Sequence, residues 1–409
     1  MSRICFVTLY AYPLFNPAIN HIFGGAEVRA WLFGVGLSKV PGCKVSFIVL
    51  NHGQPHVEDY GPIKVYRHSH YRARPSFNGR LMGRVQDLLY RFRHPLAPSL
   101  RIDHYRISST KCFIYEKVDA DLYCIFGVSD FSAEIAAFCR RHKKKFVLFS
   151  SNDDDFSLDY YPGSERKNAY GSIGSLCHYT IMHADLIVTQ TQKQSELLEK
   201  RFGRTSATVF NPIELAPKRK VSEIPEGRNV VLWIGKSNRI KRPEILLDLA
   251  GLFPDISFVM VLNRSDPKIH GEILRRKTEN LLILESVDYR DVETLFAQAF
   301  LLINTSVFEG FPNTFLQAGK YGVPILSLQA NPDGFIKRYG CGKVTDGNLS
   351  EFTKGMKFMI SNPDFRHQCS ENIKRYVRSH HDLNDKVKEL DQILRNIMEE
   401  KNGVRIEAT

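Results

Sequence analysis

The segment 308–318, Phe-Glu-Gly-Phe-Pro-Asn-Thr-Phe-Leu-Gln-Ala, carries the residues with the clearest capacity for chemistry in this sequence. It follows an expected strand and opens an expected helix. Gly310 would let a ligand approach the backbone closely, and Pro312 suits the first turn of a helix. Asn313 or Thr314 can cap that helix, whose free amides then face a ligand. A helix N-terminus at the end of a parallel strand binds anions, so a diphosphate fits here.

Glu309 stands immediately before this helix start. Its carboxylate can accept hydrogen bonds from hydroxyl groups. One carboxylate beside an anion site predicts a ligand with both phosphate and polyol character, as in a sugar nucleotide. The alternative interpretation of the local pattern is an ordinary capped helix.

Two further loops favour a sugar nucleotide. Gly24 and Gly25 follow the first expected strand and open a helix, which suits the close approach of a phosphate. In the second half of the chain, Gly235 and Lys236 follow a strand and Lys241 precedes the next helix. Cations at these places could neutralise a leaving diphosphate. For any single lysine, a solvated basic loop is the alternative.

The elements that must position these residues alternate along the whole sequence. Apolar runs of the kind found in strands buried on both faces of a parallel sheet cover 4–9, 44–50, 121–126, 145–149, 186–189, 229–234, 257–262, 281–284, 301–304 and 323–328. Helical patterns lie between them, near 28–35, 131–141, 243–252, 266–277, 289–298 and 313–321. Such alternation predicts α/β domains with parallel sheets.

A charged stretch with three prolines, 212–228, separates two of these arrays. The sequence predicts one Rossmann-like domain over 1–214, a linker over 215–228 and a second Rossmann-like domain over 229–383. An amphipathic helix near 384–400 is expected to pack back on the first domain. The first residues predict a buried strand and not a signal peptide, and no apolar run approaches the ~20 residues that cross a bilayer. We therefore expect a cytoplasmic protein.

Taken together, these motifs resemble those of the family 4 (group 1) retaining glycosyltransferases, which have the GT-B fold. The resemblance rests on Gly-Gly-Ala-Glu at 24–27, the Gly-Lys loop that begins at 235, a Glu-x7-Gln motif at 309–317, and the segments 184–189 and 210–212. It covers nearly the whole chain. It implies two doubly wound, Rossmann-like parallel-sheet domains that face a central cleft, the first for the acceptor and the second for a nucleotide-sugar donor.

The resemblance also implies roles for individual residues. It assigns donor binding to Gly24, Gly25, Gly235, Lys236, Lys241, Glu309, Gly310, Phe311, Pro312, Asn313, Thr314 and Gln317. Within this set, Lys236 and Lys241 would bind the diphosphate, and Glu309 would contact the donor sugar; these three form the catalytic set. The amides of 310–314 would cradle sugar and phosphate, and Gln317 would meet the ribose. By the same resemblance no metal or other cofactor is required, and the leaving phosphate takes the acceptor proton while anomeric configuration is retained.

Three positions depart from the family pattern. Gln317 stands where a glutamate is usual, which makes the motif Glu-x7-Gln. Lys236 replaces the usual arginine, so the charge is kept but the bidentate geometry is lost. Phe126-Gly127-Val128 stands where many members have a histidine that helps to position the donor, which puts the contribution of the first domain to that contact in doubt.

The run Asp153-Asp154-Asp155 contains a D-x-D pattern, which in a different transferase fold holds a manganese ion. Here it follows a strand of the first domain, with Asn152 before it. We interpret it as a polar loop at the mouth of the cleft, with Asn152, Asp153 and Asp155 as candidate contacts for acceptor hydroxyls and not as metal ligands.

Other residues with metal-binding capacity are not arranged for it. The histidines at 68, 70, 380 and 381 lack partners at metal spacing and are expected on the solvated surface. The eight cysteines contain no C-x-x-C pair and form no cluster with histidines. A disulfide framework or a zinc site is therefore not expected.

The chain is basic, with a formal net charge of +12 and a pI near 9.2, which implies an anionic partner. Segment 64–111 holds eleven Lys or Arg against two Asp, and so most of that charge. Within it, residues 79–93 combine an apolar stripe with Arg80, Arg84, Arg91 and Arg93, which suits an anionic membrane surface. A core-facing helix with a solvated basic back is the alternative.

We therefore predict a retaining hexosyltransferase that moves a sugar from a nucleotide diphosphate donor, expected to be a UDP-sugar, to a glycan or lipid-linked acceptor in surface polysaccharide biosynthesis. It would act in the cytoplasm, where residues 79–93 could hold it peripherally on the inner face of the membrane. One alternative is a nucleotide-sugar 2-epimerase of the same fold, for which we find no Asp, Glu and His acid–base set. The other is a basic nucleic-acid-binding protein, but the basic segment has no recognised RNA-binding signature, so no nucleic-acid partner is expected.

Overall fold

The computed structural model describes residues 2–19, 23–72, 100–102, 105–107, 109–215, 230–285, 287 and 291–399. The chain divides into two compact units, here called unit 1 (residues 1–209 and 384–409) and unit 2 (residues 210–383). It therefore passes from unit 1 to unit 2 after Val209 and returns after Leu383. The expected basic helix over 79–93, and all but the first residue of the expected linker, lie outside the described residues.

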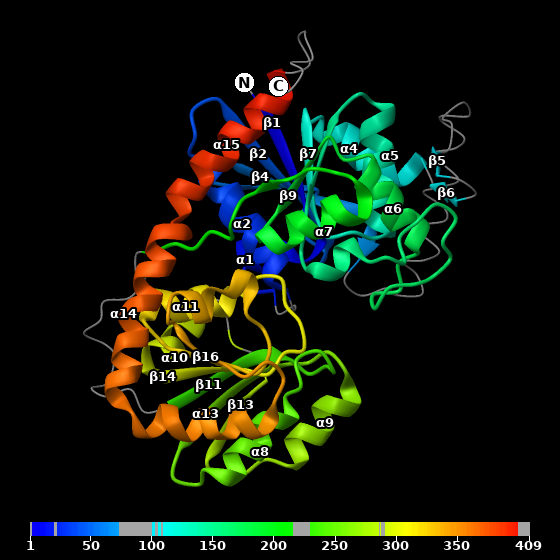
Figure 1. Cartoon of the computed structure of the whole chain (residues 1–409). Coiled ribbons are helices and arrows are strands. Elements are labelled where there is room, and N and C mark those ends of the chain that lie inside the picture. Colours follow the sequence, from blue (N-terminus) through cyan, green and yellow to red (C-terminus); the bar gives the residue numbers. More distant parts are fainter. Residues whose placement is uncertain are drawn as a thin grey trace. The chain divides into compact units, whose positions relative to one another are not determined.

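Unit 1 is built on an eight-stranded sheet with the order β10-β9-β8-β7-β1-β2-β4-β3 (Figure 1). Its strands are β1 (Ser2–Val7), β2 (Cys43–Asn51), β3 (Val57–Tyr60), β4 (Ile63–Arg72), β7 (Leu122–Phe126), β8 (Lys145–Phe149), β9 (Leu186–Thr189) and β10 (Ala207–Thr208). All neighbouring strands are parallel except β3 and β4. The short strands β5 (Leu100–Ile102) and β6 (Tyr105–Ile107) form a separate antiparallel ribbon.

Helices cover both faces of this sheet. The helical elements are η1 (Leu9–Ala11), α1 (Tyr12–Phe15), α2 (Gly25–Leu37), α4 (Ser109–Val118), α5 (Asp130–Arg141), η2 (Asp153–Phe156), α6 (Gly174–Met182), α7 (Gln192–Phe202) and α15 (Leu383–Glu399). Side chains alternate along β1, so that Cys5 and Val7 join the apolar cluster formed with α5 and α6, while Phe6 stacks on Phe47 below α2. A Cβ on Gly34 of α2 would lie 2.4 Å from the Phe47 ring, so only glycine allows the helix this close to the sheet.

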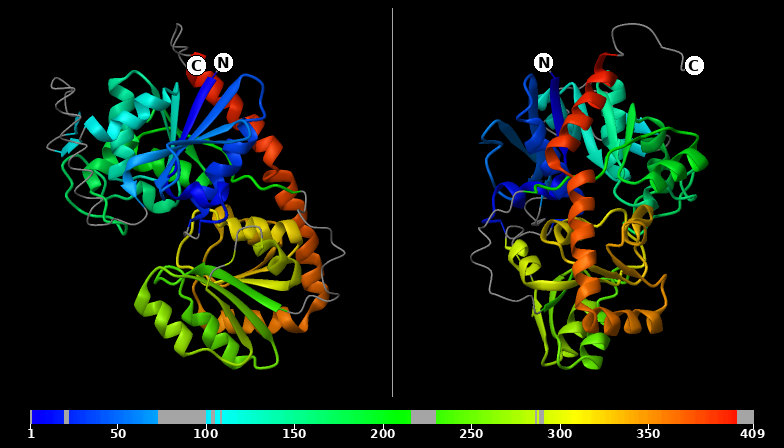
Figure 2. Two further views of the ribbon diagram at one scale, coloured as in Figure 1. Left: turned by 180° about the vertical axis from the view of Figure 1, so that it is seen from behind. Right: turned by 60° about the vertical axis from the view of Figure 1, so that its left-hand side comes forward.

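Helix α15, red in Figure 2, belongs to unit 1 although it is the last element among the described residues. It packs beside α2, where a Cβ on Gly36 would lie 2.2 Å from Val387. The Cys43 thiol of β2 lies 3.5 Å from the Asp391 carboxylate, and the Arg395 guanidinium donates to the Pro41 carbonyl at 3.3 Å. The buried side chains of α15 and these contacts hold the helix against the first strands of unit 1.

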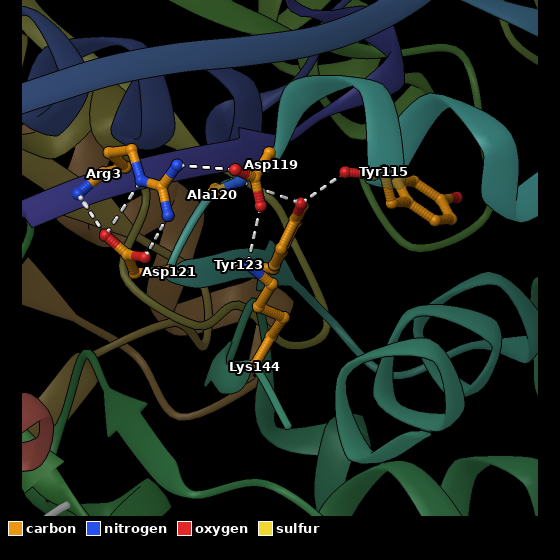
Figure 3. A network of polar contacts seen from close by, with 7 residues as sticks. All are labelled: Arg3, Tyr115, Asp119, Ala120, Asp121, Tyr123 and Lys144. Carbon is orange, nitrogen blue, oxygen red and sulfur yellow. Dashed lines mark hydrogen bonds and ion pairs between the residues drawn. The ribbon is translucent and has the colours of Figure 1, made fainter. Parts of the chain in front are cut away.

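The amino ends of β1, β7 and β8 are joined by a polar network (Figure 3). Arg3 forms ion pairs with Asp119 and Asp121, each at 2.6 Å, and Lys144 reaches Asp119 at 2.8 Å. The buried Tyr123 hydroxyl completes the turn between α4 and β7 by donating to a backbone carbonyl at 2.6 Å. This network lies at the sheet edge opposite the carboxyl ends of the strands, where ligands of such folds bind.

Unit 2 has a six-stranded sheet with the order β13-β12-β11-β14-β15-β16, and its described strands are all parallel. The strands are β11 (Val230–Lys236), β12 (Ser257–Asn263), β13 (Leu281–Leu284), β14 (Ala299–Asn304), β15 (Ile325–Ser327) and β16 (Gly342–Val344). The helices are α8 (Glu244–Leu252), α9 (Pro267–Arg275), α10 (Val292–Gln298), α11 (Asn313–Tyr321), η4 (Pro332–Gly334), α12 (Phe335–Arg338), α13 (Leu349–Ser361) and α14 (Pro363–His380).

Two apolar layers hold the sheet of unit 2. One contains side chains of α10, α11, α12 and α14, and the other contains side chains of α8, α9 and α13 (Figure 1). The prediction of two parallel-sheet α/β domains is confirmed. No helix among the described residues is long and apolar enough to span a bilayer.

Candidate active site

The strand order of unit 2 reverses between β11 and β14, and ligands of open parallel sheets bind outside the carboxyl ends of the strands at such a point. One loop follows β11 and another follows β14, and the amide of Val307 joins them by donating to the carbonyl of Ile240 at 2.9 Å. These loops carry five of the twelve residues expected to bind a donor, namely Lys241, Glu309, Gly310, Phe311 and Pro312, and Lys236 ends β11 directly before the first loop.

Lys241 and Glu309 form an ion pair between the two loops, from Nζ to Oε1. The same carboxylate oxygen accepts a hydrogen bond from the Ser306 hydroxyl at 2.6 Å. The Lys241 side chain is 25% exposed and that of Glu309 is 14% exposed. The lysine expected to bind diphosphate and the carboxylate expected to contact sugar are thus direct neighbours. A bound anion would compete with Glu309 for Lys241.

Thr305 fixes the backbone around this ion pair. Its buried hydroxyl accepts a hydrogen bond from the Trp233 indole at 2.9 Å and donates to the Lys241 carbonyl at 2.5 Å. The Arg242 guanidinium donates to the Thr305 carbonyl at 2.9 Å, and Arg242 has a φ of 46° in the left-handed region. Asn238 accepts from the Lys241 amide at 2.9 Å. Lysine 241 is therefore held at its backbone on both sides.

The backbone at the start of α11 presents amide donors that bond to no acceptor in the described part of the chain. Among the described residues, no hydrogen bond is made by the amides of Gly310, Phe311 or Thr314, whereas the Phe315 amide donates to the Pro312 carbonyl at 3.0 Å. Gly310 and Phe311 are buried. Buried amides are rarely left without a partner, so an anionic or hydroxyl-bearing ligand is expected to accept from them. Pro312 has no amide hydrogen, so its part in the expected cradle is limited to shape.

The remaining donor-binding candidates of unit 2 lie near these loops. Gly235 faces the Trp233 ring, which a Cβ would approach to 2.6 Å, so this glycine makes room for the indole that donates to Thr305. Lys236 ends β11, is half-buried, and forms no ion pair with any residue that the structure describes. Gln317 lies one turn into α11 and is 7% exposed. All three are placed close to the loops in sequence, and their contact with a ligand stays a prediction.

In unit 1, Gly24 and Gly25 begin α2, after β1 and next to the strand-order reversal between β1 and β7. The Gly24 amide donates to the Glu27 carboxylate at 2.7 Å, which is the half of a capping box that a glycine at this position can form. Part of the expected phosphate-binding capacity of this helix end is therefore already taken by Glu27.

A buried arginine, which no motif in the sequence indicates, lies one turn further along α2. Arg29 is 2% exposed and donates to the carbonyls of Ser150 at 2.9 Å and Val209 at 3.1 Å. Its guanidinium lies 5.3–5.8 Å from the ring centroids of Phe33, Phe126 and Phe149. Burial lowers the pKa of Arg29 to about 9. This side chain ties α2 to the end of β8 and to the last residue of unit 1 before the chain leaves it.

The loop 152–155 forms a short helical turn with its own internal bonds. Asp155 is buried and accepts from the amides of Ser151, Asn152 at 3.2 Å and Val128 at 3.3 Å. Burial raises the pKa of Asp155 to about 6, against the opposite effect of these amides. Its carboxylate already accepts from three backbone amides, and its contact with an acceptor stays a prediction.

Asn152 and Asp153 are only partly buried, whereas Asp155 is buried. Asn152 caps the turn by accepting from the Asp154 amide at 2.8 Å, and Asp153 pairs with Lys193 at 2.6 Å and accepts from Gln194 at 3.3 Å. No group of three or more His, Cys, Asp or Glu suited to a metal ion occurs within the described residues. These contacts account for the D-x-D pattern as a structural turn.

The expectation that the isolated histidines are solvated is wrong for two of them. His68 and His381 are both fully buried. His68 lies 3.4 Å from the Tyr115 hydroxyl, and His381 contacts the segment that begins unit 2. Neither contact could be seen from spacing, because the partners are 47 and 170 residues away.

Solved structures similar to this chain define its fold class. It is similar to sucrose-phosphate synthase from Thermosynechococcus elongatus, with a TM-score of 0.71 and 12% identity, over 97% of this chain and 99% of that one. It is also similar to Anabaena HepE solved in complex with UDP-glucose, with a TM-score of 0.67 and 13% identity, over 97% and 100% of the two chains. The chain has the GT-B fold.

Residues 216–376 match the family described as glycosyl transferases group 1. The matched residues lie within unit 2 and make up less than half of the chain. An uncharacterized glycosyltransferase of Haemophilus influenzae is 24% identical over 206 residues, which are 47% of this chain and 57% of that protein. The chain spans about half the length of the curated relatives it matches.

Proposed function

We propose that this protein is a retaining glycosyltransferase that moves a sugar from a uridine diphosphate donor to a glycan or lipid-linked acceptor, in the assembly of a surface polysaccharide. One observation carries the proposal. At the strand-order reversal of unit 2, the buried residues Gly310 and Phe311 follow Glu309 of the Lys241–Glu309 ion pair, and their amides bond to no residue that the structure describes. This combination suits a ligand with both an anionic and a hydroxyl-bearing part. The complex of Anabaena HepE with UDP-glucose supports a uridine nucleotide as the donor.

In the proposed reaction, the acceptor hydroxyl attacks the anomeric carbon of the donor sugar as the bond from that carbon to the phosphate oxygen breaks. The acceptor proton passes to the leaving phosphate, so no protein base is needed. Lys241, Lys236 and the amides before α11 would offset the negative charge that grows on the diphosphate. Glu309 would orient the donor sugar by accepting from its hydroxyls. Asn152 and Asp153 would contact the acceptor.

A thermal-shift screen tests the donor. A ligand at 100 times its dissociation constant stabilises the folded protein by about 2.7 kcal/mol, which is easily measured. We expect UDP and a UDP-sugar to raise the melting temperature of the full chain, with and without a metal chelator. A chain that no nucleotide sugar stabilises would refute the proposal, and stabilisation lost on chelation would refute the metal-free mechanism.

Product analysis tests the reaction. The full chain is incubated with the stabilising UDP-sugar, with and without acceptor candidates, and the anomeric linkage of any product is read by NMR. Transfer with retention supports the proposal. Conversion of the donor to its 2-epimer in the absence of acceptor would identify an epimerase instead.

A further inference from the structure

The two passages of the chain between the units are bonded to each other. Segment 210–213 enters unit 2 and segment 381–383 leaves it. The Ile213 amide donates to the His381 carbonyl at 2.8 Å, and the Leu383 amide donates to the Ile213 carbonyl at 3.1 Å. The two segments therefore form one small parallel bridge.

A buried asparagine on the entering segment reaches the loop before α11. Asn211 is 3% exposed, and its Nδ2 donates to the Phe311 carbonyl at 3.0 Å and lies 3.4 Å from the Asn313 Oδ1. A side-chain amide donates through two hydrogens, so it can serve both acceptors at once. Asn211 thereby holds the last carbonyl before Pro312 and the first residue of α11.

A buried histidine on the leaving segment holds Asn211 in turn. The Nδ1 of His381 lies 2.7 Å from the Asn211 carbonyl, and its Nε2 lies 3.3 Å from the Tyr376 hydroxyl. A carbonyl only accepts, so Nδ1 carries a hydrogen and Nε2 of the neutral ring can accept from Tyr376. The His381 ring also packs 4.8 Å from the ring of Phe311. We call Asn211 and His381 the Asn211–His381 clamp.

The clamp acts on the backbone that presents the unbonded amides. The hydrogen bond to the Phe311 carbonyl fixes the rotation about the Cα–C bond of Phe311. The contact with Asn313 fixes the start of α11. The amides of Gly310, Phe311 and Thr314 lie on either side of these two anchors. A donor site whose amides are already oriented binds without the cost of ordering them.

We propose that Asn211 and His381 are positioning residues for the nucleotide-sugar donor. They touch neither donor nor acceptor, and act by orienting the amides of Gly310, Phe311 and Thr314. This inference rests on the proposed function, because it assumes that those amides bind a diphosphate.

The test is isothermal titration of UDP into variants of the full chain. Asn211→Asp keeps the shape of the side chain and replaces the donor by an oxygen that faces the Phe311 carbonyl. His381→Phe keeps the ring beside Phe311 and removes the donor to Asn211. We expect the Kd for UDP to rise about tenfold in Asn211→Asp, which equals about 1.4 kcal/mol. We expect a rise of about threefold in His381→Phe, and recovery to the native value in His381→Asn, whose amide can replace Nδ1 as donor.

Asn280→Asp is the matched control for a merely structural effect. Asn280 donates to three carbonyls, of Ala250, Phe253 and Ile256, at 2.9–3.0 Å in the same unit, away from the two loops. We expect this variant to lower the melting temperature at least as much as Asn211→Asp, and to leave the Kd for UDP unchanged.

The outcomes separate this inference from the proposed function. If the native chain binds UDP and both Asn211→Asp and His381→Phe bind it equally well, the clamp does not position the donor. An equal loss of affinity in Asn280→Asp would show that general destabilisation is the cause, which also overturns the inference. If Asn211→Asp fails to fold, His381→Phe and its recovery in His381→Asn decide. A native chain that binds no UDP-sugar refutes the proposed function itself.

Discussion

Replacing Glu309 by glutamine should separate nucleotide binding from catalysis. In the structure, the Glu309 carboxylate is paired with Lys241 and accepts from Ser306 at 2.6 Å. A diphosphate that uses Lys241 must compete with this carboxylate and is repelled by its charge. Glutamine keeps the size of the side chain and an oxygen for Ser306, but removes the charge. Lys241 then becomes fully available to the diphosphate.

The size of the effect follows from this ion pair. A hydrogen bond between Lys241 and a charged partner contributes about 1.5–3 kcal/mol, against about 0.5–1.5 kcal/mol for a neutral one. The difference, ~1.2 kcal/mol, corresponds to roughly an eightfold lower Kd for UDP in Glu309→Gln. Turnover should fall about a hundredfold or more, since a charged contact to the donor sugar strengthens as the glycosidic bond breaks.

The assay is titration calorimetry with UDP, together with initial rates on the stabilising UDP-sugar. Glu293→Gln is the matched control. Glu293 of α10 is also 14% exposed and pairs at 2.7 Å with a lysine, Lys320, but this lysine lies near the end of α11 and not at its start. The control should change neither the Kd for UDP nor turnover. A Glu309→Gln enzyme that binds UDP more weakly than the native chain, or keeps near-native turnover, would refute the roles given to Glu309 and Lys241.

Three further predictions follow from other parts of the chain. Gln317→Ala should raise the donor KM about tenfold with little change in turnover, and Gln317→Glu should be tolerated; a loss of turnover as large as in Glu309→Ala would show that the ribose is not its partner. Because burial raises the pKa of Asp155 to about 6, above its unfolded value near 4, the stability it contributes is present below pH ~4 and lost as the pH rises through 6. The unfolding free energy of the native chain relative to Asp155→Asn should therefore fall by up to about 3 kcal/mol from pH 4 to 7, measured as melting temperatures; a difference independent of pH would contradict this. Each arginine near an anionic bilayer contributes about 1 kcal/mol to membrane binding. Charge reversal of the four arginines of segment 79–93 should therefore release the protein from anionic vesicles in a flotation assay and leave catalysis on a soluble acceptor intact. If the native chain does not bind such vesicles, the segment is a solvated face and not a membrane-binding one.

Much of the fold could be predicted because buried parallel strands have continuous apolar sequences. The expected bounds of β8, β9, β13 and α11 agree with the structure to the residue. The strand β4 was not predicted, although it pairs with β2. Its first residues alternate, with Ile63 and Val65 buried and Lys64 exposed, and its later residues are mostly polar. A strand of this composition does not stand out from a polar loop.

The candidate site was predicted in part, for a physical reason. Glu309 and its neighbours stand together in sequence because one strand end and one helix start carry them. The residues that hold them come from distant parts of the sequence. The Trp233 indole donates to Thr305 across 72 residues, and the Asn211 side chain donates to the Phe311 carbonyl across 100. Thr305 and Ser306 lie close to Glu309 in sequence, but only the bond of Ser306 to Glu309 is local. Long-range side-chain bonds leave no spacing signal, so the supporting residues had to come from the structure.

Helix α15 has a consequence for the order in which the chain can fold during synthesis. Unit 2 is one continuous stretch, 210–383, whereas unit 1 is completed only by residues that follow it. When Leu383 has left the ribosome, all of unit 2 is available to fold. The α2 side of unit 1 still lacks Val387, Leu390 and Leu394, which are buried in the finished protein. Domains of nascent chains generally fold from the N-terminus onward. Unit 1 is therefore synthesised first but completed last. We expect its apolar α2 side to remain accessible to chaperones until α15 has left the ribosome.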